Sequence, residues 1–263
     1  SERADLIHGF TIKCVVYASI AARIAGVRSR VNAIAGMGYV FVSSDLKARL
    51  LRPVVRLLFR LLIGGRRTLT ILQNPDDVAM LVDSGLIKAG AIRLIPGSGV
   101  NCSLFLPAEA AGSDGEFKVL LAARLLYDKG IREFVEAARA LRQRGLSIRF
   151  LIAGAPDPGN PAAIPQSEVD GWVNEELVVW LGHVEEMSSL LREVSVFVLP
   201  SYREGLPKSL IEAAACEVPV IATDVPGCRH VVDHEVTGLL VPARDSAALA
   251  SAIARLEAQP ELG

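Results

Sequence analysis

Short, continuously apolar segments alternate with helix-like segments through the second half of the chain, and this pattern limits the possible folds more than any other feature. We predict strands at Phe117–Ala123, Ser147–Ala153 and Val194–Leu199. Helices are predicted at Gly130–Arg142 and Ser246–Leu256. Because strands buried on both faces are typical of parallel sheets covered by helices, the sequence predicts an α/β fold with a doubly wound parallel sheet.

The chain is long enough for two domains. It has 263 residues, of which 51% are hydrophobic and 22% charged, so it can bury a large core. Earlier strands are predicted at Arg30–Ala35 and Thr68–Leu72, and small and turn-forming residues gather at Pro107–Gly115. We therefore predict a first domain at 1–107, a linker at 108–116 and a second domain at 117–263.

The composition argues against several classes of protein. A net charge of −1 provides no overall basic field of the kind that nucleic-acid-binding domains have, so we expect no nucleic-acid partner. The four cysteines form no C-x-x-C pair, which favours neither a disulfide framework nor a zinc site. No uncharged apolar run is long enough for a membrane-spanning helix, and the first residues do not have the form of a signal peptide. We therefore expect a cytoplasmic protein.

Two carboxylates lie eight positions apart in Glu204-Gly-Leu-Pro-Lys-Ser-Leu-Ile-Glu212. This segment follows the predicted strand Val194–Leu199, and Pro207 suits the first turn of a helix. The backbone N–H groups of residues 206–209 would then face the space beyond the strand end, where parallel sheets bind ligands and a helix start attracts phosphate. We interpret the pattern as a nucleotide-sugar site rather than a metal site. The alternatives are a capped surface turn and the acid and nucleophile of a hydrolase.

A second group of charged residues follows the strand Phe117–Ala123. Arg124 and Lys129 put two cations in the loop between this strand and the next helix. An arginine that forks two oxygens and a lysine that acts as a point charge suit a diphosphate. Taken alone, the same pair is also typical of a solvated turn.

Three motifs occur in order along the second half of the chain. They are Ala123-Arg-Leu-x3-Lys129-Gly, Glu204-x7-Glu212 and Gly227…Asp233-x4-Gly238-Leu-Leu-Val-Pro242. Together they resemble the donor-binding half of the retaining glycosyltransferases of family four, which have the GT-B fold of two facing Rossmann-like domains. The resemblance implies two doubly wound parallel-sheet domains here. It also implies that the N-terminal one is incomplete, because relatives begin with a further strand, a glycine-rich loop and helices.

The resemblance assigns roles to individual residues. Arg124 and Lys129 would bind the donor diphosphate, and Glu204 would lie near the donor sugar; these three are the candidate catalytic residues. Glu212 would accept hydrogen bonds from the ribose hydroxyls, and the backbone around His183 would read the base. The predicted donor-binding residues are Gly182, His183, Val184, Gly205, Leu206, Pro207, Lys208, Ser209 and Glu212.

The first half resembles the bacterial branch of the family, which builds capsule, lipopolysaccharide or glycoprotein glycans on a polyprenyl-diphosphate carrier. This similarity is carried by His8-Gly-Phe-Thr-Ile-Lys13 and Gly36-Met-Gly-Tyr-Val-Phe41. It implies acceptor-side roles for His8 and Gly38. Many relatives have a second histidine two positions after the first, where this chain has Phe10, so His8 is either an acceptor-side residue or a packing residue.

The function implied is transfer of a sugar, with retention, from a nucleotide-sugar to a glycan or a polyprenyl-diphosphate-linked acceptor in surface polysaccharide synthesis. We expect the donor to be a UDP-sugar. The family is metal-independent and proceeds by front-face attack, so the resemblance implies no metal, no other cofactor and no enzyme nucleophile. The alternative is a GT-B nucleotide-sugar epimerase or hydrolase, or a fragment that only binds nucleotide.

A basic, strongly apolar helix is predicted at Leu46–Ile63. Its arginines recur at helical spacing on one face: Arg49, Arg52, Arg56 and Arg60. The helix is either a core helix with a solvated stripe or, through residues 46–67, a contact with an anionic membrane surface. The second reading predicts peripheral association with the inner face of the plasma membrane, where a polyprenyl-linked acceptor would lie.

Overall fold

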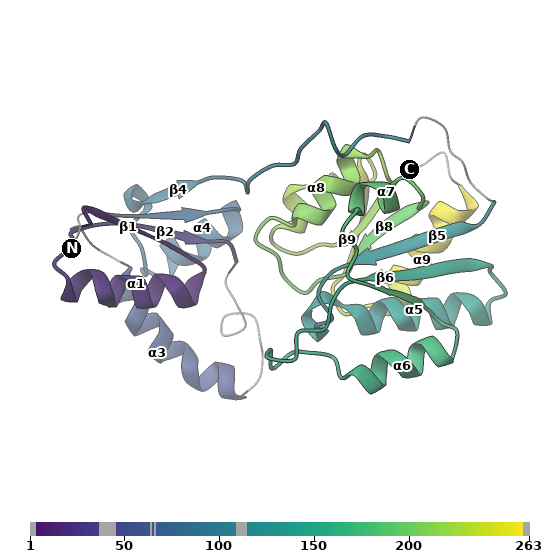
Figure 1. Cartoon of the computed structure of the whole chain (residues 1–263), viewed down its shortest axis with the longest axis horizontal. Helices are drawn as coiled ribbons and strands as arrows, with labels where there is room; N and C mark the ends of the chain where they lie inside the picture. Colours follow the sequence, from purple (N-terminus) through teal and green to yellow (C-terminus); the bar gives the residue numbers. More distant parts are fainter. Residues whose placement is uncertain (1–3, 37–45, 64, 66, 109–114, 260–263) are drawn as a thin grey trace. The chain divides into compact units, whose positions relative to one another are not determined.

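The computed structural model describes residues 4–36, 46–63, 65, 67–108 and 115–259, without the side chains of residues 46–49 and 52. The chain divides into two compact units (Figure 1). The first consists of Ser1–Ser98 with Glu204–Leu206, and the second of Gly99–Arg203 with Pro207–Gly263. Each unit has its own parallel sheet and its own core, which confirms the predicted α/β fold class.

The second unit contains a six-stranded sheet in the order β10-β9-β8-β5-β6-β7, and all neighbouring strands are parallel. The strands are β5 (Phe117–Ala122), β6 (Ile148–Ala153), β7 (Val179–Gly182), β8 (Val196–Leu199), β9 (Val220–Thr223) and β10 (Gly238–Val241). From β5 the chain continues to β6 and β7 on one side and then returns to β8 and β9 on the other. The winding therefore reverses between β5 and β8, and this is the position where open parallel sheets bind their ligands.

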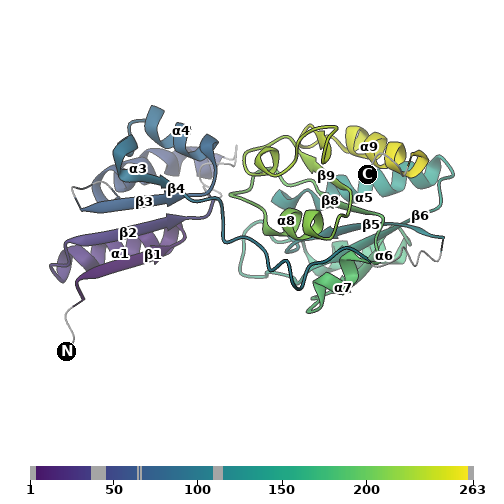
Figure 2. The same cartoon turned by 90° about the horizontal axis from the view of Figure 1, so that it is seen from above.

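The unbroken apolar runs in the strands produce two cores, one on each face of the sheet. In β5, Val119 and Leu121 belong to one core, whereas Leu120 and Ala122 belong to the other. The first core is covered by α5 (Ile131–Gln143), α6 (Gln166–Asn174) and α9 (Ser246–Ala258), and the second by α7 (Met187–Leu191) and α8 (Lys208–Ala215). Figure 2 shows α5 and α9 on one side of the strands and α7 and α8 on the other. The sheet is thus doubly wound, as predicted.

The first unit contains a four-stranded parallel sheet in the order β1-β2-β3-β4. Phe59, Ile63 and Leu81 are among the fully buried residues of its core. Asn74 caps α4 by accepting a hydrogen bond from the Asp77 amide at 2.8 Å. The elements are β1 (Leu6–Phe10), α1 (Ile12–Ile24), β2 (Ser29–Ile34), α3 (Leu46–Leu62), β3 (Thr68–Leu72), α4 (Pro75–Asp83) and β4 (Ile92–Leu94).

The division between the units lies between Ser98 and Gly99, ahead of the predicted linker at 108–116. Val100 and Phe105 pack against the core of the second unit, so the segment that contains them belongs to that unit although it precedes its first strand. Strand β5 does begin at Phe117, where the second domain was predicted to start.

Phe105→Ala is expected to lower the free energy of unfolding of the second unit by about 3–5 kcal/mol, the usual cost of truncating a buried phenylalanine. Phe105 is only 7% exposed, whereas its neighbour Leu104 is 49% exposed and provides the matched control. Leu104→Ala should change stability by about 0.5 kcal/mol or less. Both tryptophans lie in the second unit, so urea unfolding followed by tryptophan fluorescence reports on it. Equal effects of the two substitutions would contradict the assignment of Phe105 to this core.

Candidate functional site

The two loops with the predicted site residues leave the sheet of the second unit at the carboxyl ends of its central strands. One follows β5 and carries Arg124 and Lys129 before α5 begins at Ile131. The other follows β8 and leads to α8, which begins at Lys208. Because β5 and β8 are paired neighbours where the winding reverses, both loops begin at the same edge of the sheet.

Gly130 allows these two loops to approach each other closely. Its φ is +70°, and a β-carbon at this position would lie 2.1 Å from the carbonyl oxygen of Pro200, at the end of β8. The amide of Tyr202 also donates to the carbonyl of Asp128 at 2.9 Å. The backbone beside Lys129 is therefore held against the loop that leads to α8.

Arg124 is exposed and pairs with an acid that the sequence analysis did not identify. Its Nη1 lies 2.7 Å from Oδ2 of Asp157, in the segment after β6, and the two side chains are 61% and 31% exposed. Exposed pairs of this kind contribute little to stability, so the guanidinium group can exchange this carboxylate for another anion at small cost. Lys129 is half-buried in the turn Tyr127–Lys129, immediately before Gly130.

Helix α8 presents its first turn at the carboxyl end of β8. Pro207 is the residue before the helix and makes no side-chain cap, so the first backbone N–H groups have no capping partner from it. Nζ of Lys208 lies 3.0 Å from Oε1 of Glu212, one turn along the helix. The side chain of Glu212 is 13% exposed, against 63% for Lys208. This end of the helix therefore combines amide donors with a shielded carboxylate that pairs with a cation.

The remaining predicted residues have different positions. Glu204, Gly205 and Leu206 lie in the loop between β8 and α8 and are grouped with the first unit, so their roles stay predictions. Gly182 ends β7 with φ +67°, and its carbonyl accepts from the amide of Gly154 at 2.7 Å, which ties the ends of β7 and β6 together. His183, just beyond, is exposed, while Val184 packs against a core cluster.

The acceptor-side predictions fall in the first unit or outside the described residues. His8 lies in the middle of strand β1, which continues to Phe10. Its ring lies on the same face as that of Phe10, with centroids 4.2 Å apart, and both side chains are exposed. The role of His8 therefore stays a prediction. Gly38 lies outside the described residues.

Tyr202 and Glu133 are two further site residues that the sequence analysis missed. The hydroxyl of Tyr202 donates to Oε1 of Glu133 on α5 at 2.6 Å, and the guanidinium carbon of Arg244 lies 4.5 Å from the centre of the tyrosine ring. Burial, and then the hydrogen bond to Glu133, raise the pKa of Tyr202 well above its usual value. These contacts hold the β8 loop against the first turn of α5. No local pattern marks them, because the two residues are 69 positions apart.

Unpaired polar atoms are buried at the same edge of the sheet. Oδ1 of Asp128, Oε2 of Glu133 and Oγ of Ser201 have no hydrogen-bond partner in the part of the chain that the structure describes. Such atoms destabilise a fold and are typical of functional sites. Three independent features, namely the cations, the helix start and these atoms, thus occur where the winding of the sheet reverses.

A family model described as glycosyl transferases group 1 matches residues 116–259. The chain belongs to the group 1 glycosyltransferase family. The matched region includes β5 to α9 and therefore both loops of the site. This confirms the family and the class of enzyme that the motifs predicted.

Individual relatives agree with the family match. The chain is 28% identical over 96% of its length to an N,N'-diacetylbacillosaminyl-diphospho-undecaprenol α-1,3-N-acetylgalactosaminyltransferase from Campylobacter jejuni and spans 67% of that protein. Sucrose-phosphate synthase from Thermosynechococcus elongatus has a similar structure, with a TM-score of 0.83 and 28% identity over 98% of this chain and 65% of that one.

Anabaena HepE, solved in complex with UDP-glucose, superposes with a TM-score of 0.79 at 21% identity, covering 98% of this chain and 70% of that one. The structural neighbours are GT-B glycosyltransferases, which confirms the predicted fold class. The chain spans about two thirds of the length of these three proteins.

Gly130→Ala is expected to lower the free energy of unfolding by about 3 kcal/mol or more, because the new methyl group would collide with the Pro200 backbone in a strained conformation. Gly145→Ala is the matched control, since Gly145 ends the same helix region with φ +80° and open space around it. The control should cost about 1–2 kcal/mol, the left-handed penalty alone. Urea unfolding measures both. Indistinguishable losses would show that the two loops are not in close contact.

Proposed function

We propose that the chain binds a nucleotide-sugar, expected to be a UDP-sugar, at the carboxyl ends of β5 and β8 and transfers its sugar with retention. The observation that carries the proposal is the convergence of the two loops at this edge of the sheet. Two cations of one loop and the helix start of the other lie where parallel sheets bind phosphate-containing ligands. The HepE structure with UDP-glucose, a protein of similar fold, supports this class of donor.

Arg124 and Lys129 would bind the diphosphate of the donor. Arg124 would leave Asp157 for two phosphate oxygens, which match the planar fork of a guanidinium group better than an exposed single contact does. Lys129, fixed by the turn that ends at Gly130, would place a point charge against the leaving group. Catalysis would then consist mainly of positioning and of stabilising the negative charge that develops on the nucleotide.

Glu212 and the first turn of α8 would hold the rest of the nucleotide. The carboxylate would accept hydrogen bonds from the ribose hydroxyls, and the amides of Lys208 and Ser209 would donate to phosphate or sugar oxygens. Glu204 would lie near the donor sugar, and the backbone of Gly182–Val184 would contact the base. In this arrangement the acceptor hydroxyl gives its proton towards the leaving phosphate, so neither glutamate acts as a nucleophile and no metal takes part.

The acceptor that we propose is a polyprenyl-diphosphate-linked glycan in the synthesis of bacterial surface polysaccharide. The Campylobacter jejuni relative, whose name specifies a diphospho-undecaprenol acceptor, aligns over 96% of this chain. His8 on β1 would face the acceptor side, where its exposed ring is available for contact.

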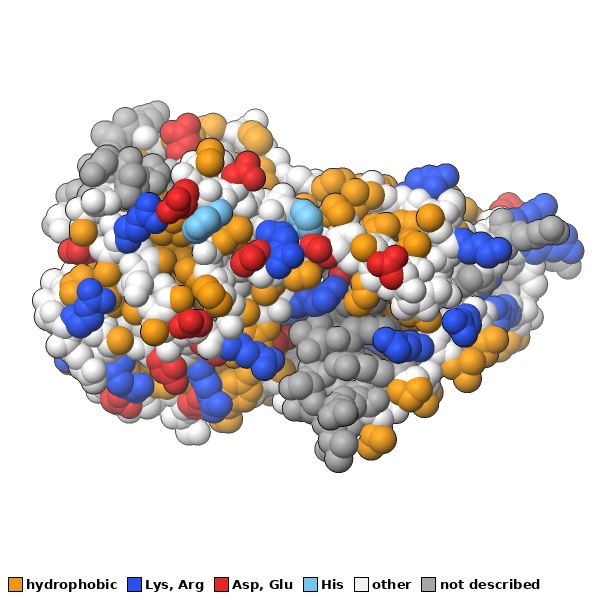
Figure 3. All heavy atoms as spheres, turned by 180° about the vertical axis from the view of Figure 1, so that it is seen from behind, with side chains coloured by type: hydrophobic (Ala, Val, Ile, Leu, Met, Phe, Trp, Pro, Cys, Tyr) orange, Lys and Arg blue, Asp and Glu red, His pale blue; other side chains and the backbone are white. Residues whose placement is uncertain are grey.

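Helix α3 supports the membrane contact that such an acceptor requires. Arg56 and Arg60 are exposed, and so are apolar side chains along the same helix: Leu50, Leu51, Val54, Leu57 and Leu61. Figure 3 shows hydrophobic and basic side chains next to one another over α3. None of the described helices is long and apolar enough to cross a membrane. We propose that α3 lies on the anionic surface of the cytoplasmic leaflet, with its leucines among the lipids.

Lys129→Ala is expected to lower turnover by about one to three powers of ten, the scale of losing one preorganised charge contact. The assay is release of UDP from UDP-sugars in the presence of a polyprenyl-diphosphate-linked acceptor. Arg144→Ala, at the opposite end of α5, removes an exposed cation and should leave the rate unchanged. A near-normal rate for Lys129→Ala would refute the diphosphate assignment. UDP release without acceptor would instead favour the hydrolase or epimerase alternative.

The double substitution Arg56→Ala/Arg60→Ala is expected to weaken binding to anionic vesicles about 30-fold, since each cation near such a surface contributes about 1 kcal/mol. Co-sedimentation with phosphatidylserine-containing vesicles measures the effect. Lys88→Ala/Arg93→Ala, which removes two exposed cations elsewhere in the first unit, should bind as the unmodified chain does. Equal binding of the unmodified chain to neutral and anionic vesicles would rule out the electrostatic contact.

A further inference from the structure

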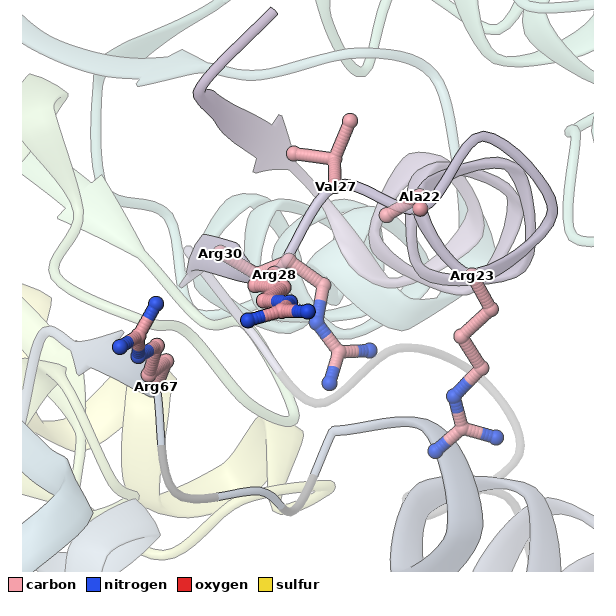
Figure 4. A pocket seen from close by; sticks show the side chains of 7 residues that line it. Ala22, Arg23, Val27, Arg28, Arg30 and Arg67 are labelled. Carbon is pink, nitrogen blue, oxygen red and sulfur yellow. The ribbon is translucent and has the colours of Figure 1, made fainter.

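Four arginines surround one pocket in the first unit. The pocket has a volume of about 600 Å³ and is lined by Ala22, Arg23, Gly26, Val27, Arg28, Arg30 and Arg67. Figure 4 shows the guanidinium groups of Arg28 and Arg30 between those of Arg67 and Arg23. Four cationic side chains from three separate parts of the chain thus face one space.

This pocket lies at the amino ends of the strands. Arg28 and Arg30 are at the start of β2, which begins at Ser29, and Arg67 directly precedes β3. The first unit's sheet is parallel, so its carboxyl ends lie at the opposite edge. The pocket is therefore separate from the strand ends where the family's substrates are expected, and the proposed transfer reaction does not use it.

Two of the arginines are held in place by the end of α3. Arg23 donates from Nη2 to the carbonyl of Leu61, and Arg30 donates from Nη1 to the carbonyl of Leu62 at 2.8 Å. Each contact uses one nitrogen of a group that has five N–H donors. The backbone amide of Arg30 also donates to the carbonyl of Arg67 at 3.0 Å, which fixes the two strand starts together. The pocket is thus preorganised by contacts within the first unit.

Capping of α3 explains Arg23 and Arg30 but leaves the other two arginines without a structural role. Arg28 and Arg67 are exposed, and neither makes a side-chain hydrogen bond or ion pair with the residues that the structure describes. None of the seven lining residues is acidic. Burial, and then the charge of Arg23, lower the pKa of Arg30. The cluster is therefore a set of like charges for which the lining provides no counter-charge.

The charge of the surrounding sequence has the same sign. Residues 1–98 contain fourteen Lys and Arg against six Asp and Glu, a net charge of +8, whereas residues 99–263 have a net charge of −9. An anion that enters the pocket would be attracted by the whole first segment as well as by the four guanidinium groups.

We propose that this arginine pocket binds a phosphate group. Planar guanidinium groups match the oxygens of phosphate, and several of them around one space favour a doubly charged phosphate monoester or a diphosphate over a single carboxylate. The phosphate can be that of a soluble ion or that of a lipid headgroup. A lipid headgroup could reach the pocket because Arg23 and Arg30 contact the last turn of α3, the helix with the exposed leucines that we propose to lie on the membrane.

Hydrogen–deuterium exchange with mass spectrometry tests the proposal at the site itself. The full chain is exposed to pyrophosphate, to phosphatidic-acid vesicles or to phosphatidylcholine vesicles, and peptides that cover 25–30 and 67–72 are monitored. We expect these peptides to be protected by pyrophosphate or by phosphatidic acid but not by phosphatidylcholine. Protection by pyrophosphate identifies a soluble phosphate ligand, and protection by phosphatidic acid alone identifies a lipid headgroup. If neither pyrophosphate nor phosphatidic acid protects these peptides, the proposal is overturned.

Substitutions separate this pocket from general electrostatic attraction. Arg28→Ala/Arg67→Ala should weaken the protecting interaction about ten-fold or more, because two charge-assisted contacts are lost. Lys88→Ala/Arg93→Ala removes the same charge from the same unit but no contact in the pocket, so it should weaken protection much less than the pocket variants do. Arg28→Gln/Arg67→Gln, which keeps the polar side chains, should match the alanine variant and provides the test if that variant folds poorly. Unchanged protection in both pocket variants would refute the assignment.

The same measurement distinguishes this pocket from the donor site. Pyrophosphate bound by Arg124 and Lys129 would protect peptides around residues 123–130, and the arginine pocket would protect those around 25–30. Protection around 123–130, with none around 25–30 from either pyrophosphate or phosphatidic acid, would overturn the arginine pocket and leave the donor site standing. Protection around 25–30 with none around 123–130 would support the pocket and count against the donor diphosphate assignment.

Discussion

The parallel pairing of β5 with β8 determines the rest of the candidate site. Val119 and Leu120 of β5 lie opposite Val196 and Phe197 of β8, and all four side chains are buried. These strands are far apart in the sequence, and the winding of the sheet reverses between them. The helices that follow them, α5 and α8, cover opposite faces of the sheet, and the N-termini of both are placed at one edge. A polar ligand at this edge would meet amide donors from both helices because the buried apolar strands force this topology.

Local contacts then convert this topology into a defined geometry. The lack of a side chain at Gly130 brings the β5 loop against the backbone of Pro200, and the Tyr202–Glu133 hydrogen bond ties the β8 loop to α5. A loop held at both ends loses little further entropy when it binds a ligand. Preorganised charges of this kind stabilise a leaving diphosphate better than mobile ones, since no reorganisation is needed during the reaction.

The strands of the second unit and the family could be predicted from the sequence, because buried parallel strands and short motifs are local patterns. Helix α6 was missed: Gly171 lies within it and a segment rich in proline and glycine precedes it, although Val169 and Trp172 pack in the core. The contacts of the site were missed for a different reason. Arg124 and Asp157 are 33 positions apart, and such pairs follow from the pairing of strands rather than from a pattern within one element.

The division between the units lies ahead of the predicted linker because of a packing contact that the local sequence does not reveal. Small and turn-forming residues mark where a chain lacks regular structure, but they do not show which core an irregular segment packs against. Phe105 lies in such a segment and is nevertheless 7% exposed in the second unit's core. A single buried aromatic side chain therefore assigns the residues around it to a domain more reliably than the composition of the linker does.

The net charge of −1 is the sum of two opposite halves, and this changes what it implies. In the acidic residues 99–263, long-range repulsion works against a nucleotide diphosphate, so the proposed binding there would have to rely on contacts shorter than the screening length of about 8–10 Å, namely two cations and a helix start. In the basic first segment, the field itself attracts anions, and exposed arginines on α3 and around the pocket of Arg28 and Arg67 can act over a surface. Averaging over the chain removes this difference. The sequence argument against a basic field therefore holds for the chain as a whole but not for residues 1–98.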